Sequence, residues 1–188
     1  LNFKFEGLSV LVTYHPVTLG NRIPKDEISD LLKALDSFSS LKVLFTMPNS
    51  DQGGEEIRSA IEAYCVRNER CRCFKSLGVR RYLSALGYVT AVVGNSSSGL
   101  LEVPSAHIPT LNIGDRQKGR TRGASVVDVA SDEASIVKGL QKVLSPNFRA
   151  FCKTTTNPYE KEGTAESIFK VISTYSLDTF LQKSFYNL

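Results

Sequence analysis

The sequence lacks the features that would assign it to a membrane-spanning or secreted class. Its longest apolar runs, such as Leu8 to Val12 with one serine inside, are far too short to cross a bilayer. The N-terminus has no basic head, apolar middle or small-residue cleavage site of a signal peptide. It also lacks an initiator methionine, so we expect a fragment of something longer. These absences favour a soluble, cytoplasmic domain.

A metal-binding class is disfavoured in the same way. The four cysteines form no CxxC pair, and neither histidine stands at the spacing of a zinc ligand beside them. We therefore expect reduced thiols, no metal and no other cofactor.

Composition indicates one globular domain of 188 residues, because 41% apolar and 22% charged residues exclude a disordered or fibrous chain. The net charge of +4 is too small to argue for nucleic acid. The basic residues gather in two segments, residues 67–81 and residues 116–122. We interpret the first as a solvated face. The second lies in the glycine-bracketed loop DRQKGRTRG, where a small anionic ligand is plausible.

Hydrophobic periodicity alternates between short apolar runs and helical spacing. The predicted strands are residues 8–13, 42–46, 71–74, 89–94, 110–113 and 125–129. The predicted helices are residues 24–38, a segment through Ile57, Ile61 and Tyr64, residues 79–86, a segment through Ile136, Leu140 and Val143, and a long terminal helix over about 164–185. Repeated strand–helix units predict an α/β fold with a doubly wound parallel sheet, Rossmann-like, in a single domain.

Ligands of such sheets bind beyond the carboxyl ends of the strands, where three loops are expected. They begin at Thr13, Gly94 and Gly114. The loop GNSSSGLLE has small residues and hydroxyls that suit a phosphate, and Glu102 could accept hydrogen bonds from a ribose. Spacing alone equally allows Gly99 to be an N-cap with Glu102 completing a capping box.

We call the loop GNSSSGLLE, from Gly94 to Glu102, the serine loop. Its sequence does not match the motifs of two other functional classes. Neither GxGxxG nor GxxxxGKS occurs, so the loop is not a standard nucleotide fingerprint. The GxSxG elbow of serine hydrolases is broken at both Ser96 and Ser97. His15 follows a buried strand and precedes a proline, which favours a functional position at the sheet edge. His107 lies in a connector, and we expect it to be structural or exposed.

Four motifs in this order resemble the hydrolysing UDP-N-acetylglucosamine 2-epimerases of the sialic-acid type. They are Tyr14 to Thr18, Gly94 to Pro104, Leu111 to Arg120, and Asn157-Pro158-Tyr159. The resemblance covers nearly the whole chain but corresponds to the C-terminal half of the family's enzyme. It implies one of two facing Rossmann-like domains in a glycosyltransferase-B arrangement, with the N-terminal domain absent. The family's NPYG is NPYE here, so the hinge into the last helix differs at Glu160.

The resemblance also implies roles for individual residues in binding the UDP-sugar. His15 would contact the diphosphate and assist departure of UDP, as the catalytic candidate of this chain. The other implied positions are Ser96, Ser97, Ser98 and Gly99 at the pyrophosphate, Glu102 at the ribose, Arg116 at a phosphate or the nucleotide, Tyr82 near the uracil, and Asn49 and Asp51 in a loop close to the substrate.

The implied reaction is anti-elimination of UDP to a 2-acetamidoglucal, followed by hydration to N-acetylmannosamine for sialic acid biosynthesis. The family's proton-handling carboxylates belong to the absent half, so we expect the isolated domain to be inactive. We expect no nucleic-acid or membrane partner, and a homo-oligomer only through the full-length enzyme. Two alternatives stay open. One is the donor-nucleotide domain of a glycosyltransferase-B enzyme, and the other is a non-catalytic domain that binds RNA or protein through its basic loops.

Overall fold

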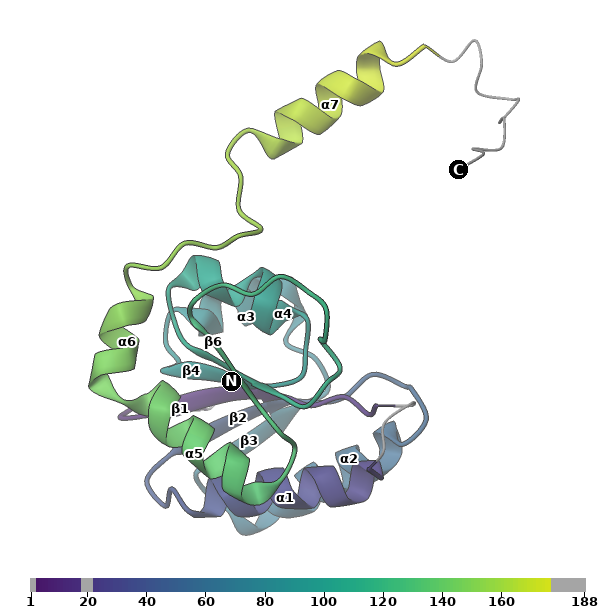
Figure 1. Ribbon diagram of the computed structural model, residues 1–188. Coiled ribbons are helices and arrows are strands. Elements are labelled where there is room, and N and C mark those ends of the chain that lie inside the picture. Colours follow the sequence, from purple (N-terminus) through teal and green to yellow (C-terminus); the bar gives the residue numbers. More distant parts are fainter. Residues whose placement is uncertain (1–2, 18–21, 177–188) are drawn as a thin grey trace. The chain divides into compact units, whose positions relative to one another are not determined.

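The computed structural model describes residues 3–17 and 22–176 and contains one six-stranded sheet in which every pairing is parallel (Figure 1). The strand order is β3-β2-β1-β4-β5-β6. The strands are β1 (Ser9–Thr13), β2 (Lys42–Thr46), β3 (Cys71–Phe74), β4 (Ala91–Gly94), β5 (Thr110–Ile113) and β6 (Val126–Val129). The predicted Rossmann-like α/β fold is confirmed.

The central strand β1 is buried on both faces because helices cover the sheet on each side. Val10 and Val12 belong to the core cluster on one face, and Leu11 belongs to the cluster on the other. This alternation explains why the strand is a nearly continuous apolar run rather than an amphipathic one. β1 pairs with both β2 and β4, so the chain winds outward from it in two directions.

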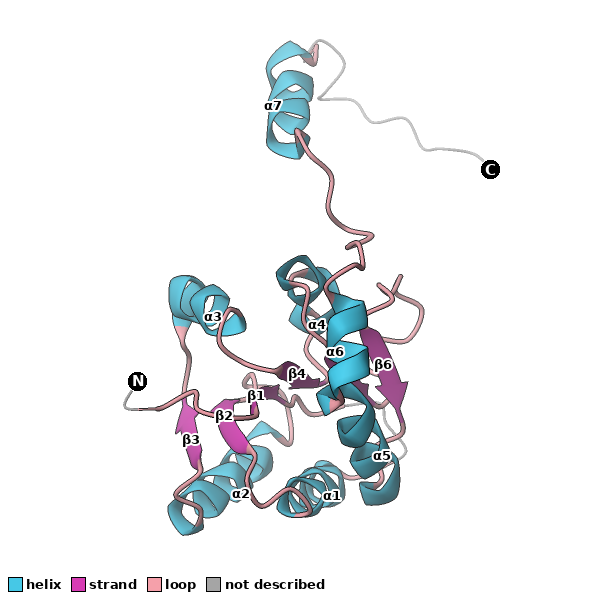
Figure 2. Cartoon of the chain, turned by 90° about the vertical axis from the view of Figure 1, so that its left-hand side faces the viewer, coloured by secondary structure: helices cyan, strands magenta, loops and turns pink. Residues whose placement is uncertain are grey.

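Figure 2 shows the two helical layers, with α1, α2 and α5 on one face of the sheet and α3 and α4 on the other. The helices of this unit are α1 (Pro24–Asp36), α2 (Gly54–Arg67), α3 (Gly78–Leu86), α4 (Ser98–Leu101), α5 (Glu133–Leu144) and α6 (Pro146–Cys152), with a 3-10 turn η1 (Val103–Ala106). Pro24 lies in the first turn of α1, followed by two acidic residues, as its sequence predicts.

Most predicted elements are confirmed with small shifts at their ends, but helix α6 was not predicted. It follows α5 after a single residue, Ser145, whose side chain accepts a hydrogen bond from the Phe148 N–H at 3.3 Å. Serine before proline is a helix-start signal, and it could have revealed this short helix.

The chain divides into two units, Leu1–Pro158 with the sheet and Tyr159–Leu188 with helix α7 (Thr164–Thr174). Helix α7 starts where it was predicted but ends at Thr174, because Tyr175 takes an extended conformation. The predicted continuation from residue 177 to about 185 lies outside the described residues, as does Thr18 of the first motif.

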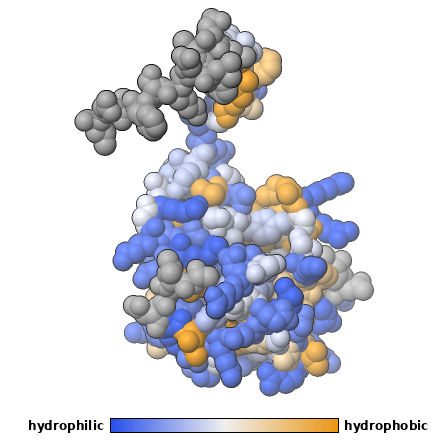
Figure 3. Space-filling model, turned by 90° about the vertical axis from the view of Figure 1, so that its right-hand side faces the viewer, coloured by the Kyte–Doolittle hydropathy of each residue, from blue (hydrophilic) through white to orange (hydrophobic). Residues whose placement is uncertain are grey.

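No residue of α7 is buried, and its apolar side chains form an exposed patch that Figure 3 shows in orange. In residues 3–17 and 22–176, no helix combines the length and apolar character that crossing a membrane requires.

Gly94 ends β4 at the point where this strand meets β1. Its φ is +133°, and a Cβ atom placed there would lie 1.9 Å from the carbonyl oxygen of Thr13. The close approach lets the Asn95 N–H donate to that same oxygen at 3.2 Å. A glycine is therefore required for β1 and β4 to deliver their loops to one place.

We expect Gly94→Ala to destabilise the chain by about 3 kcal/mol or more, since the backbone conformation and the Thr13 carbonyl both oppose a side chain. Urea denaturation followed by circular dichroism measures the effect. The matched control is Gly87→Ala, because Gly87 has a helical φ of −72° and a Cβ atom there would meet nothing closer than 3.4 Å. Equal destabilisation by both substitutions would contradict the assignment.

Candidate functional site

The loops that follow β1, β2, β4 and β5 meet at the carboxyl edge of the sheet. Because β1 and β4 are neighbours, residues far apart in sequence become adjacent there. The Asn95 side chain accepts from the His15 N–H at 2.7 Å and donates to the His15 carbonyl at 2.8 Å. The edge between β1 and β4 is the topological switch point of the sheet, where ligands of open α/β folds bind.

The serine loop turns directly from β4 into the short helix α4. Gly99 N–H donates to the Ser96 carbonyl at 3.1 Å, and Ser98 N–H lies 3.4 Å from Ser96 Oγ. Across the described residues, no hydrogen bond involves the N–H of Ser96 or Ser97. Two main-chain donors of the predicted cradle are therefore available, and two are engaged within the loop.

The capping-box alternative for this loop is wrong. Helix α4 starts at Ser98, so Gly99 lies inside it and Glu102 is its C-terminal boundary residue. Gly99 is buried against Thr110, whose Oγ1 donates to the Gly99 carbonyl at 2.8 Å. Glu102 is exposed and has no capping role at the start of the helix.

A cavity of about 440 Å³ opens beside the serine loop, between the strand ends and helix α3. Four of the predicted residues line it: Tyr82, Ser96, Ser98 and Glu102. The Tyr82 and Ser98 hydroxyls lie 2.5 Å apart, and burial raises the pKa of Tyr82 above its usual value. The remaining lining residues are Thr13, Thr46, Met47, Lys75, Ser76, Leu77, Gly78, Val79 and Leu83. The structure thus adds the hydroxyls of Thr13 and Thr46, themselves 2.5 Å apart, at the ends of β1 and β2.

His15 does not line this cavity, and its backbone is held by two hydrogen bonds with Asn95. The Asn49 N–H donates to His15 Nδ1 at 3.1 Å. Because Nδ1 accepts, the neutral ring carries its proton on Nε2. Burial, and then the charge of Arg116, holds the pKa of His15 below its ordinary value. The ring is thus a neutral hydrogen-bond donor.

Arg116 is half-buried and has no carboxylate partner in the part of the chain that the structure describes. Its Nη1 donates to the Asn95 carbonyl at 3.3 Å, beside the Gln117 Nε2, which donates to the same oxygen at 2.8 Å. By contrast, Arg122 of the same loop pairs with Asp128 at 2.6 Å. An uncompensated, partly buried guanidinium beside free main-chain N–H groups is suited to an anion.

The other residues singled out from the sequence, Asn49, Asp51, Ser97 and His107, do not line the cavity. Asn49 is tied to His15 through its N–H, and its Nδ2 donates to the exposed Asp51 at 2.5 Å. Ser97 precedes α4 without lining the cavity. His107 lies 3.1 Å from the Thr155 carbonyl through Nδ1, away from these loops, as its connector position predicted.

Two residues that support the site through hydrogen bonds, Asn95 and Gln117, were not predicted from the sequence. Both are buried polar residues directly beside motif residues that were assigned, with exposed fractions of 0% and 2%. A polar residue that immediately follows a buried strand was the available signal for Asn95.

The described ranges contain no group of three or more His, Cys, Asp or Glu side chains that could hold a metal ion.

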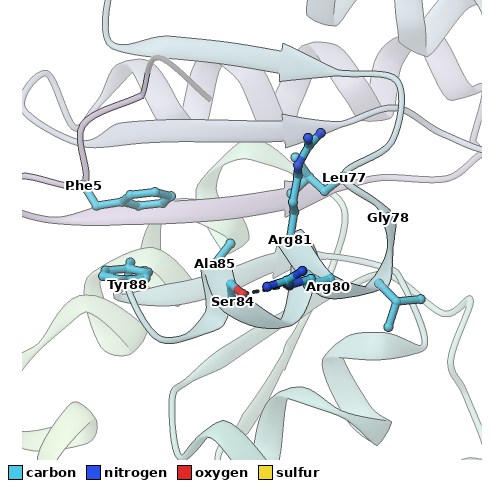
Figure 4. Close-up of a pocket in the computed structure, with 9 residues that line it drawn as sticks. Phe5, Leu77, Gly78, Arg80, Arg81, Ser84, Ala85 and Tyr88 are labelled. Carbon is cyan, nitrogen blue, oxygen red and sulfur yellow. Dashed lines mark hydrogen bonds between the residues drawn. The ribbon is translucent and has the colours of Figure 1, made fainter.

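A second cavity, of about 550 Å³, runs along α3 (Figure 4). The rings of Phe5 and Tyr88 stack at one end of it, 5.6 Å apart, and Leu77 lies at the other. None of the predicted site residues lines this hollow. Phe5 and Tyr88 precede β1 and β4, so it extends toward the amino ends of the strands.

The sequence of the chain matches a known family. A family model described as UDP-N-acetylglucosamine 2-epimerase matches residues 3–173. The chain belongs to this family.

Members of the family with curated names include a Campylobacter jejuni GDP/UDP-N,N'-diacetylbacillosamine 2-epimerase (hydrolyzing), 36% identical over 100% of this chain and 49% of that protein. The Escherichia coli polysialic acid biosynthesis protein P7 is 36% identical over 88% of this chain and 42% of its own length. The chain therefore spans about half the length of these relatives.

A Methanocaldococcus jannaschii UDP-GlcNAc 2-epimerase, solved in complex with UDP-GlcNAc and UDP, has the same fold. Its TM-score is 0.68 at 10% identity, covering 88% of this chain and 45% of that one. At 10% identity, this similarity supports the fold of the present chain and nothing further.

We expect Arg116→Ala to raise the pKa of His15, because the substitution removes a positive charge that opposes protonation of the ring. Proton NMR titration of the His15 ring measures the shift. Arg120→Ala is the matched control, since it removes the same charge from an exposed position of the same loop. An unchanged His15 titration in Arg116→Ala would contradict the geometry.

The lowered pKa of His15 also predicts that the stability of the folded chain depends on pH. The unfolded chain binds a proton at His15 near 6.5, whereas the folded chain does so only at lower pH. The stabilising contribution is therefore present above about 6.5 and is lost as pH falls through the folded pKa. His15→Gln should reduce the dependence of the free energy of unfolding on pH in that range, measured by urea denaturation; an identical dependence in both proteins would oppose the assignment.

Proposed function

We propose that this chain is the nucleotide-binding part of a hydrolysing UDP-N-acetylglucosamine 2-epimerase. The observation that carries the proposal is the convergence of His15 and Arg116 on one residue of the serine loop, Asn95, where that loop lines a 440 Å³ cavity. These groups offer neutral donors, a guanidinium and free main-chain N–H groups, which together suit a diphosphate better than a single phosphate.

The nucleoside would occupy the cavity beside α3. Its apolar and aromatic lining, Leu77, Val79 and Tyr82, suits the face of a base, and Glu102 at its rim suits the ribose hydroxyls. The diphosphate would then extend across the serine loop toward His15 and Arg116. This places the sugar beyond the carboxyl edge of the sheet, where the part of the relatives that this chain does not span would enclose it.

In the proposed reaction, a base removes the proton at C2 of the sugar while the bond from C1 to the UDP oxygen breaks. Negative charge then gathers on the departing diphosphate. Arg116, the Ser96 and Ser97 N–H groups and the His15 Nε2–H are preorganised donors for that charge. Water next adds to the resulting 2-acetamidoglucal and gives N-acetylmannosamine.

The base that removes the C2 proton would not come from this chain. His15 accepts a hydrogen bond at Nδ1 and is needed as a donor at Nε2, so neither nitrogen is free to take a proton. We propose that carboxylates of the unspanned half carry out proton transfer and that the isolated domain is inactive alone.

The first test is calorimetry of the chain with UDP, UMP and GDP. We expect UDP to bind, UMP to bind more weakly, and Arg116→Ala to weaken UDP binding by about tenfold to a hundredfold, the loss of a charged hydrogen-bond donor. Arg120→Ala should have little effect, because Arg120 is exposed and does not line the cavity. Absence of any nucleotide response, or salt-sensitive RNA binding instead, would overturn the proposal.

The second test is an epimerase assay. We expect no turnover of UDP-N-acetylglucosamine by this chain and N-acetylmannosamine production after mixing with a matching N-terminal half. Transfer of the sugar to an acceptor without release of N-acetylmannosamine would instead favour the glycosyltransferase alternative.

A further inference from the structure

Asn95 is fully buried and has all of its polar groups engaged. Its side chain forms the two hydrogen bonds with the His15 backbone, and its own N–H donates to the Thr13 carbonyl. Its carbonyl accepts from both Arg116 and Gln117. One side chain and one peptide unit thus connect the loops that follow β1, β4 and β5.

An asparagine has the chemistry that this position requires. A backbone N–H and a backbone carbonyl of the same residue must be met by one acceptor and one donor on a single planar group, which is what a carboxamide provides. An aspartate of the same shape offers only acceptors, and it would face the His15 carbonyl with a negative charge. An alanine would leave both backbone groups of His15 without these bonds.

The position of Asn95 also explains how the anion-binding groups keep their spacing. His15 and Arg116 lie on loops that are separated in sequence, and the three serines of the serine loop directly follow Asn95. Movement of any one of these loops would break a hydrogen bond to Asn95. With no exposed surface, Asn95 cannot touch the ligand itself.

We propose that Asn95 is a positioning residue that fixes His15 and Arg116 relative to the serine loop, and that this fixed spacing makes the site selective for a diphosphate. The inference rests on the proposed function. It predicts that loss of Asn95 weakens binding of the phosphates and spares binding of the nucleoside, which occupies the separate cavity beside α3.

The experiment measures affinities of uridine, UMP and UDP by protein-observed NMR titration, which also reaches weak binding. In Asn95→Ala and Asn95→Asp we expect UDP binding to weaken by about tenfold or more while uridine binding stays unchanged. Tyr64→Phe is the control for a general loss of stability. It removes the hydroxyl that donates to Asp36 and accepts from Arg70, both at 2.7 Å, on the face of the sheet that α1 and α2 cover. We expect it to leave the ratio of UDP to uridine affinity unchanged.

A second readout is the ring of His15. Nitrogen chemical shifts should show the proton on Nε2 in the wild-type chain and a mixture of tautomers in Asn95→Ala, because the backbone no longer holds Nδ1 against the Asn49 N–H. A merely structural role of Asn95 would not change the tautomer in protein that is still folded.

A third measurement needs no substitution, so it decides the matter even if both variants fail to fold. In the wild-type chain, the Asn95 side-chain amide and the His15 backbone amide should shift with UDP and not with uridine. Unchanged affinity ratios in folded variants, or an Asn95 amide that ignores UDP while the serine loop responds, would overturn the positioning role. A wild-type chain that binds UDP no better than uridine would overturn the proposed function instead.

Discussion

The parallel pairing of β1 with β4 is the constraint on which the rest of the site depends. It brings Asn95 and His15 together across 80 positions of sequence, and Gly94 permits the approach because its hydrogen atom faces the Thr13 carbonyl. With the two loops side by side, a buried carboxamide completes the backbone hydrogen bonding that the strands no longer provide. The site is thus an extension of the sheet's own bonding pattern past its edge.

Among the partly buried arginines of the described residues, Arg116 at this edge differs from the others in its partners. Arg22, Arg58, Arg70 and Arg122 each have a carboxylate partner, whereas Arg116 donates only to a carbonyl in the described part of the chain. Burial and the nearby guanidinium keep His15 neutral, which preserves it as a donor. A site with surplus positive charge and preorganised donors is suited to stabilising a departing diphosphate.

Much of the fold was predictable because its signals are local. The apolar run of β1, the proline and acidic residues at the start of α1, and the helical spacing of α5 each reflect the burial of one segment against its neighbours. Helix α6 was missed because its seven residues carry too little periodicity, and only the Ser145-Pro146 start identifies it. The end of α7 depended on the conformation of Tyr175, which no apolar pattern encodes.

The parallel α/β architecture, the three loops at the strand ends and the resemblance carried by their motifs could all be read from local patterns of residues. Three features of the site became visible only in the folded chain: Asn95 joins those loops, Gln117 supports them, and Ser96 and Ser98 line a cavity while Ser97 and Gly99 do not. The physical reason is that hydrophobic periodicity arises within one element, whereas hydrogen bonds between loops depend on strand order, register and distance. Those quantities are fixed only when all six strands have paired.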